Sequence, residues 1–195
     1  MDRNAAWGLV CEWTTSPTLR KHMLAVEAAM RAYAEHFGED AECWGIVGLV
    51  HDLDYERFPS QEAGHPFRGV EILRAAGYPE VVTRAVLSHA DYSGVPRESL
   101  MEKTLFACDE LTGFIIAVAL VKPGRSLTEV DPSSIQRKLK DKAFARGVKR
   151  DDIYQGAAEI GLSLDEHIAF VLRALQQVAE SLGLGSAAAV PHPSE

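Results

Sequence analysis

The chain has 195 residues, of which 47% are hydrophobic and 25% are charged, a balance typical of a globular domain with a buried core. This balance excludes fibrous proteins and largely disordered ones. The apolar stretch 114–121 is far shorter than the roughly 20 residues that cross a bilayer, and the first residues already include Asp2, Arg3 and Glu12, unlike a signal peptide. We therefore expect a cytoplasmic protein with no membrane partner.

The net charge of −8 is unevenly distributed along the chain. Residues 136–150 hold seven basic residues and one acidic residue, so this window carries +6 and the remainder −14. The acidic balance excludes general binding of a nucleic-acid duplex, whereas the basic segment suits a small anionic substrate. The three cysteines are odd in number and form no CxxC pair, which excludes a disulfide framework and a cysteine-rich zinc site.

Apolar residues recur at three- and four-residue steps, which predicts helices, and no segment shows the alternation of a strand. Gly38 ends the first helix, and Pro66 and Pro79 open the third and fourth. Capping boxes at Ser99–Glu102 and Ser163–Glu166 predict two more helix starts. In chain order the predicted helices span residues 18–37, 40–53, 66–77, 79–89, 104–121, 132–149 and 163–182.

The fold class that follows is all-α, with a single helical domain over residues 1–182. Its core, about 18–121, holds the polar residues considered next. A basic helix that continues to Lys149 and a C-terminal helix occupy about 132–182. Residues 183–195, rich in alanine and proline, are expected to form a flexible tail.

Histidines and aspartates occupy helix faces that are otherwise apolar. Burying such a group without a partner costs about 1–3 kcal/mol, so each one needs an explanation. A single histidine on an apolar face is more often a hydrogen-bonded core residue than a ligand, but here several helices each contribute one. One bound cation stabilises several such groups at once, and imidazole with carboxylate is the ligand set of zinc, iron, manganese, cobalt or nickel. The candidate ligands are His22, His51, Asp52, His65, His89 and Asp109.

The order of these residues resembles the H…HD…D signature of the HD superfamily of metal-dependent phosphohydrolases. His22 matches the first histidine, His51-Asp52 the doublet that names the family, and Asp109 the distal aspartate. The doublet alone is a weak signal, because a two-residue match is common by chance, whereas the ordered set on helices is specific. The resemblance covers roughly residues 19–114 and implies an HD-domain helical bundle.

Two further histidines extend the match. His65, in HPFRG, and His89, in LSHADY, match the additional histidines of members that hold two metals. The resemblance therefore implies one or two divalent ions, and in the two-metal case Asp52 would bridge them. It also implies hydrolysis of a small phosphate ester or nucleotide, in which a hydroxide held by the ions attacks phosphorus in line.

The residues after the doublet depart from the family pattern. Several two-metal relatives carry a lysine three residues beyond the aspartate, where this chain has Tyr55. Asp54 and Glu56 flank this tyrosine, and either could donate a proton or orient water. Together with Asp52 they are the candidate catalytic residues, although a solvated loop acid is an equally good interpretation of Asp54 and Glu56.

A phosphate substrate needs cationic contacts other than that lysine. Arg68, within HPFRG, and Arg97 are close in sequence to the candidate metal ligands. Lys138 and Lys142 are four residues apart, on one face of the predicted basic helix. These four residues are the candidate substrate contacts, although a run of charge is more often a solvated helix face.

Two other functions fit the same residues. Some HD-fold proteins use the same six ligands to hold two irons and activate oxygen, so a di-iron oxygenase is the alternative enzyme. A non-catalytic binding module with structural metals is less favoured, because structural zinc sites usually close with four ligands. The sequence does not choose between the metals and does not indicate the substrate or the oligomeric state.

Overall fold

The computed structural model describes residues 2–185, and within them it is all-helical with no strand. This confirms the predicted fold class and the single helical domain. None of the described helices combines the length and the apolar character that crossing a bilayer would require. The described α-helices are α1 (Arg3–Trp13), α2 (Pro17–Phe37), α3 (Ala41–Val50), α4 (Phe67–Ala75), α5 (Glu80–Ser88), α6 (Leu100–Leu120), α7 (Pro132–Lys140), α8 (Arg150–Glu159) and α9 (Leu164–Gln177), with the short 3-10 helices η1 (Asp91–Ser93) and η2 (Leu127–Glu129) between them.

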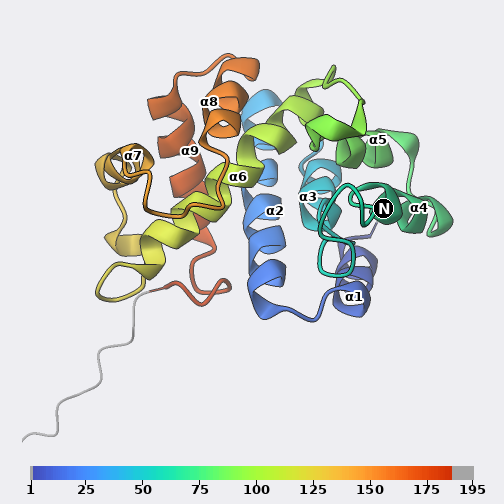
Figure 1. Cartoon of the computed structure of the whole chain (residues 1–195), viewed down its shortest axis with the longest axis horizontal. Helices are drawn as coiled ribbons and strands as arrows, with labels where there is room; N and C mark the ends of the chain where they lie inside the picture. Colours follow the sequence, from blue (N-terminus) through green and yellow to red (C-terminus); the bar gives the residue numbers. More distant parts are fainter. Residues whose placement is uncertain (1, 186–195) are drawn as a thin grey trace, which may run out of the picture.

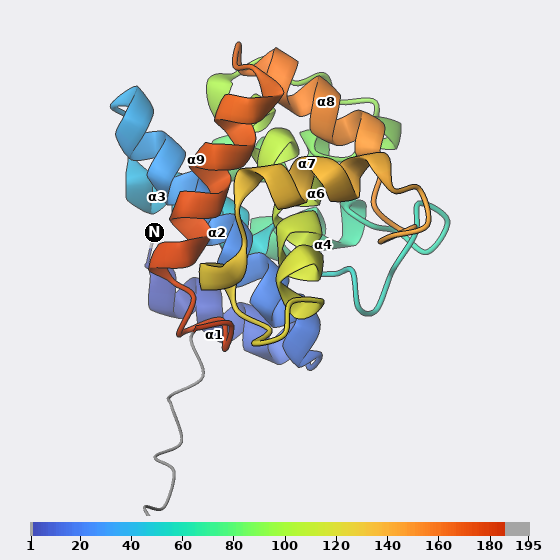
Figure 2. The same cartoon turned by 90° about the vertical axis from the view of Figure 1, so that its left-hand side faces the viewer.

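Two 21-residue helices, α2 and α6, form the centre of the domain (Figure 1). Helices α1, α3, α4 and α5 lie to one side of them, and α7, α8 and α9 lie to the other. Figure 2, which views the molecule from the latter side, shows these C-terminal helices in front of α6. Helix α2 packs along α3, and α6 packs against α2, α8 and α9. A polar side chain where these central helices meet their neighbours is therefore largely removed from water.

The ends of the predicted helices follow local signals. Gly38 ends α2 in the left-handed region, with φ of 74°, a conformation that glycine adopts at little cost. Both predicted capping boxes are present, Ser99 with Glu102 at α6 and Ser163 with Glu166 at α9. The local sequence thus determines where three of the longest helices begin or end.

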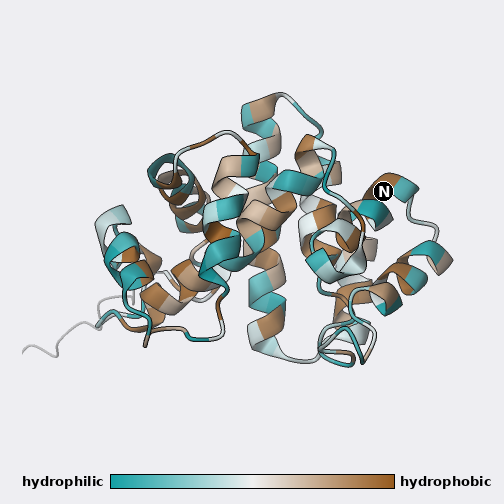
Figure 3. Ribbon diagram, turned by 45° about the horizontal axis from the view of Figure 1, so that its top comes forward, coloured by the Kyte–Doolittle hydropathy of each residue, from teal (hydrophilic) through white to brown (hydrophobic). Residues whose placement is uncertain are grey.

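Glycines allow the central helices to approach their neighbours closely. A Cβ on Gly48 of α3 would lie 2.9 Å from the Glu27 amide nitrogen and the Val26 carbonyl oxygen of α2. A Cβ on Gly156 of α8 would lie 2.5 Å from the Ala107 Cα of α6. Hydrophobic and hydrophilic residues alternate around the helices (Figure 3), and the buried apolar side chains form one continuous core.

The prediction of one basic helix over 132–149 is wrong. Helix α7 ends at Lys140, residues 141–149 form a loop, and α8 follows. Lys138 and Lys142 therefore do not share a helix face. Helix α1 is also missing from the prediction, because its apolar stripe is short and buries only Ala6 and Val10.

The side chain of Arg150 holds the loop that replaces the predicted helix. Its guanidinium donates hydrogen bonds to five backbone carbonyl groups, which a continuous helix would use internally. These bonds run from Nε to Leu139 (3.0 Å), from Nη1 to Ala145 and Val148 (both 3.4 Å), and from Nη2 to Asp141 (3.0 Å) and Phe144 (2.5 Å). The loop is therefore held in a defined shape although it contains little regular structure.

The end of the described chain is packed against the domain. Leu184 is buried, and its carbonyl oxygen accepts a hydrogen bond from the Leu127 amide at 2.8 Å. The packed region thus extends past the predicted boundary at 182. The remainder of the predicted tail, 186–195, lies outside the described residues.

Candidate metal centre

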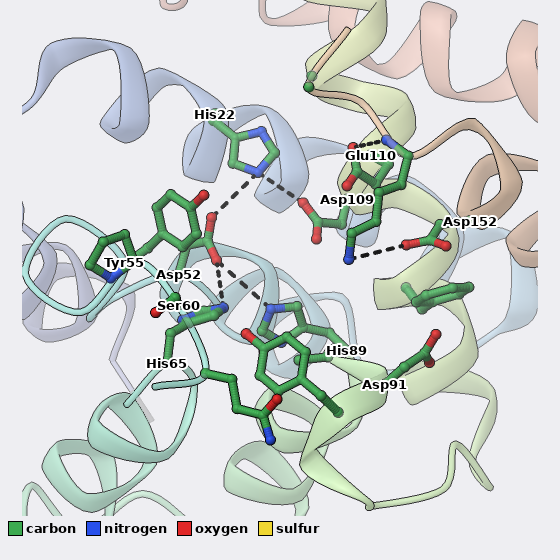
Figure 4. Close-up of a pocket in the computed structure, with 18 of the residues that line it drawn as sticks. His22, Asp52, Tyr55, Ser60, His65, His89, Asp91, Asp109, Glu110 and Asp152 are labelled. Carbon is green, nitrogen blue, oxygen red and sulfur yellow. Dashed lines mark hydrogen bonds and ion pairs between the residues drawn. The ribbon is translucent and has the colours of Figure 1, made fainter. Parts of the chain in front are cut away.

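The six candidate ligands lie together where helix ends meet the two central helices. Figure 4 labels His22, Asp52, His65, His89 and Asp109 around this point. The central helices contribute one residue each. The C-terminal ends of α3 and α5 and the loop before α4 contribute the others, so segments far apart in sequence meet at one point. The residues are His22 (α2), His51 and Asp52 (end of α3), His65 (before α4), His89 (end of α5) and Asp109 (α6).

One half of this cluster is formed around Asp52 Oδ2. The Nε2 atoms of His51 and His22 lie 3.5 Å and 3.8 Å from this oxygen. Asp109 closes the group, with its Oδ1 3.0 Å from His22 Nε2 and 3.5 Å from His51 Nε2. Two imidazole nitrogens and two carboxylate oxygens therefore face a common point.

The other half is formed around the second oxygen of the same carboxylate. Asp52 Oδ1 lies 3.6 Å from His65 Nε2 and 3.8 Å from His89 Nε2. The two rings stand beside each other with centroids 5.2 Å apart. In each half, three ligand atoms lie within 4.8 Å of one another, close enough to share one ion.

Hydrogen bonds behind the cluster orient three of the four rings. The Nδ1–H of His51 donates to the Gly48 carbonyl (2.8 Å), and that of His89 donates to the Val86 carbonyl (2.5 Å). The Nδ1–H of His65 donates to the Asp54 carboxylate at 2.7 Å. Such bonds fix the tautomer and aim the lone pair of Nε2 at the centre, as is usual for histidines that bind metal.

Asp54 therefore has a different position from the one predicted. It is fully buried, and its second oxygen accepts a hydrogen bond from the Gly69 amide at 2.7 Å. Both oxygens are used behind His65, and Asp54 does not line the pocket. This is the geometry of a residue that positions a ligand rather than of a substrate contact or proton donor.

Burial and charge show that the cluster is suited to a cation. Nε2 of His51 is buried and has no hydrogen-bond partner. Burial raises the pKa of Asp52, but the interaction with His51 outweighs burial and lowers that pKa to about 2. Burial, together with His51, lowers the pKa of His89 to about 4, so this ring is neutral and its lone pair is available. A bound cation would satisfy both the buried nitrogen and the paired carboxylates.

The centre opens into a cavity of about 520 Å³, within the range of small-molecule sites. Tyr55 and Tyr92 line it and are partly exposed, and acidic groups line much of the remaining wall. Asp91, Glu110 and Asp152 also line the cavity and were not among the predicted site residues, and Lys149, predicted only as the end of the basic helix, lines it as well. Glu110 follows a candidate ligand on α6, which is a usable signal, but the other three depend on how α8 and η1 pack.

The other predicted site residues do not reach this cavity. Glu56 turns toward α2, where it accepts hydrogen bonds from the amides of Thr15 and Ser16 at 2.8 Å. Arg68 is exposed and pairs with Glu71 at 2.7 Å.

Arg97 contacts two residues of the cavity wall, Asp91 and Phe106, without lining the cavity itself, and the two lysines are engaged elsewhere. Arg97 forms a two-pronged ion pair with Glu159 at 2.8 Å and 2.9 Å, and its guanidinium lies over the Phe106 ring. It lines a neighbouring hollow instead of the cavity at the cluster. Lys138 lies over the Phe144 ring, 4.7 Å from its centroid, and Lys142 is exposed on the loop. The structure therefore does not support these three as contacts of a substrate at the cluster.

A comparison with protein families agrees with this geometry. The family model described as HD domain matches residues 19–113, a range that begins just before His22 and ends just after Asp109. Comparison of the chain with curated proteins and with solved structures gave no match. Residues 19–113 of this chain therefore form an HD domain, of the family whose members are typically metal-dependent phosphohydrolases.

Proposed function

We propose that this protein hydrolyses a small phosphate ester or a nucleotide, using two divalent ions at the six-residue centre. The observation that carries the proposal is that the two oxygens of the Asp52 carboxylate face different pairs of histidines. One oxygen faces His22 and His51, and the other faces His65 and His89. A carboxylate with two imidazoles on each side is the donor set of a bridged pair of ions.

Each half of the centre would hold one ion. His22, His51, Asp109 and Asp52 Oδ2 form one donor set; His65, His89 and Asp52 Oδ1 form the other. Imidazole and carboxylate donors suit iron, manganese, zinc, cobalt or nickel. When bound, such ions supply positive charge to a phosphoryl group and lower the pKa of a water molecule that attacks it.

The chain supplies the geometry for this chemistry. The backbone carbonyls behind His51 and His89 hold these rings in place before any ion binds, so little reorganisation is required. The second half has fewer protein donors, which leaves more coordination positions there for water and substrate. The adjoining cavity, with Tyr55 and Tyr92 at its wall, has room for the remainder of a small ester.

The test is phosphate release by the full chain loaded with Mn²⁺, Fe²⁺, Co²⁺, Zn²⁺ or Ni²⁺, against phosphomonoesters, nucleotides, cyclic nucleotides and dinucleoside polyphosphates. Asp52→Ala removes the two oxygens that the halves share, and we expect the rate of phosphate release to fall more than about 100-fold. Replacing residues that only orient metal ligands already costs about 10- to 100-fold in metal affinity or activity. Asp151→Ala, which removes an exposed aspartate on α8, is the matched control and should retain full activity. Metal analysis of the wild type should give two ions per chain.

Two results would overturn this proposal. One is the absence of phosphate release from every substrate with every metal. The other is oxidation of a substrate by the iron-loaded protein that requires oxygen, which would identify the di-iron oxygenase instead. Phosphate release at equal rates with and without oxygen would support the hydrolase.

A further inference from the structure

The loop over residues 141–149 brings one positive charge to the cavity at the metal centre. Lys149 is the single lysine or arginine among the described residues that line this cavity. It follows the HD match, which ends at residue 113, so it is an addition to the matched domain. The other ionisable residues of the wall outside the six-residue cluster are acidic or aromatic, and the acids are Asp91, which pairs with Arg97, Glu110, whose pKa burial raises to about 7, and Asp152.

We propose that Lys149 binds a phosphate group of the substrate at the wall of this cavity. This inference rests on the proposed phosphohydrolase function and identifies a residue outside the matched domain that selects an anionic substrate. Tyr55 stands three residues after Asp52, where several two-metal relatives carry a lysine, and it brings no positive charge to the cavity.

The backbone of Lys149 is fixed, whereas its exposed side chain is held only by one weak ion pair. Its amide donates to Glu110 Oε2 at 3.3 Å, and Arg150 next to it holds the loop through five carbonyl groups. The ammonium group is 3.9 Å from Asp152 Oδ2, and 67% of the side chain is exposed. An exposed pair at that distance is weak, so a doubly charged phosphate can replace Asp152 as the partner.

The neighbouring acids direct the ammonium group toward the cavity. Glu110 and Asp152 lie in the cavity wall, and both attract the Lys149 side chain to that wall. Gly147 also lines the cavity, and a Cβ there would meet no atom within 4 Å, so the loop leaves space beside the lysine. A phosphate that enters the cavity therefore meets a cation that is already held nearby.

The variant Lys149→Ala removes the charge and leaves the local backbone intact. Lys149 is the N-cap residue of α8, but its side chain makes no capping hydrogen bond. Lys140→Ala is the matched control, since Lys140 is an exposed lysine at the end of α7 and does not line the cavity. Lys149→Arg keeps the charge and tests whether a cation suffices.

The measurement is the dissociation constant of inorganic phosphate for the Mn²⁺-loaded full chain, by titration calorimetry. We expect Lys149→Ala to weaken phosphate binding about 10-fold, the loss of one charge-assisted contact, and Lys149→Arg to restore most of it. Lys140→Ala should bind phosphate like the wild type. Unfolding temperatures should be equal in all four proteins, because the replaced side chains are exposed.

Equal phosphate affinities of Lys149→Ala and Lys140→Ala would overturn the inference, and so would a wild type that does not bind phosphate. Both outcomes are separable from failure of the proposed function, because the titration follows binding and needs no turnover. A protein that binds phosphate through Lys149 but releases none from any ester would retain this inference and lose the proposed reaction.

Discussion

Asp54 shows how a residue without access to substrate can control the chemistry. It accepts the Nδ1–H of His65 and the Gly69 amide, both at 2.7 Å, and so fixes the ring whose other nitrogen faces Asp52. A carboxylate in this position also makes the imidazole a better donor to a cation. Its importance lies in orienting His65, one layer behind the donor atoms.

We predict that Asp54→Asn lowers the affinity for the ion in the His65–His89 half by about 10- to 100-fold, because the amide is a weaker acceptor for the imidazole N–H. Competition with a chelator, followed by metal analysis, measures this affinity. Glu56→Gln is the control, since Glu56 lies two residues further along and turns away from the cavity. Equal affinities in the two variants would contradict the role assigned to Asp54.

His167 is a buried histidine outside the metal centre. Its Nε2–H donates to the Ala107 carbonyl at 2.9 Å, and its Nδ1 accepts the Tyr33 hydroxyl proton at 2.7 Å. Burial lowers the pKa of His167 to about 4, and the bond to Ala107 offsets this only in part. The folded chain therefore keeps His167 neutral at pH values where the unfolded chain protonates it.

The sign of the pH effect follows from that difference. Between pH 6.5 and about 4 the unfolded state binds a proton that the folded state does not, so stability falls as pH falls through this window. We predict that His167 alone removes up to about 3 kcal/mol by pH 4, from a shift of about 2.5 pKa units. Denaturant unfolding at a series of pH values should show a shallower decline for His167→Gln, and an unchanged decline would refute the prediction.

Among the elements, α2 and α3 set the position of the first half of the centre. Gly48 of α3 touches the backbone of α2, and its carbonyl oxygen accepts the hydrogen bond that orients His51. The contact between these helices and the orientation of that ring therefore depend on one residue. A displacement of α3 would move His51 and Asp52 together.

We predict that Gly48→Ala lowers the free energy of unfolding by about 1–2 kcal/mol, since overpacking typically costs 1–3 kcal/mol and alanine regains up to about 1 through helix propensity. Gly8→Ala on α1 is the matched control, because a Cβ there meets no atom within 4 Å. It should leave stability unchanged or raise it. Chemical denaturation measures both, and equal stabilities would show that α3 can move without cost.

The sequence pattern indicates the six residues that cluster in the structure, whose role as metal ligands stays a prediction, but it does not indicate the loop near them. His22 and His89 interrupt apolar helix faces, and that pattern can be recognised from the sequence alone because it depends only on residues within a few positions. The 141–149 loop could not be recognised, because a run of lysines and arginines is compatible with a helix. In the folded chain Arg150 instead binds carbonyl groups six to eleven residues before it and holds the loop that carries Lys149 to the cavity.

At the scale of the whole molecule, the centre joins the N-terminal helices to α6. Its residues come from α2, α3, α5, α6 and the loop before α4, so a bound ion would connect parts of the chain up to 87 residues apart. Ligands that bind only the folded state stabilise it by mass action. The metal should therefore act on global stability as well as on catalysis.

We predict that adding Mn²⁺ at 100 times its dissociation constant raises the unfolding temperature by about 5–10 °C, which corresponds to about 2.7 kcal/mol for one ion. A chelator should reverse the rise. Asp52→Ala should abolish the rise, whereas Asp151→Ala should keep it. A rise of equal size in both variants would place the stabilising ion somewhere else.

In the proposed two-ion centre, a single carboxylate that serves both halves would also link the occupancies of the two ions. The first cation to bind would neutralise part of the charge on Asp52, so the second would be attracted less strongly and would also be repelled by the first. The half with two carboxylates and two imidazoles should fill first, and the His65–His89 half should fill at higher concentration. Loading would thus be sequential and anticooperative, and the cell's free metal concentration would decide whether the protein carries one ion or a pair.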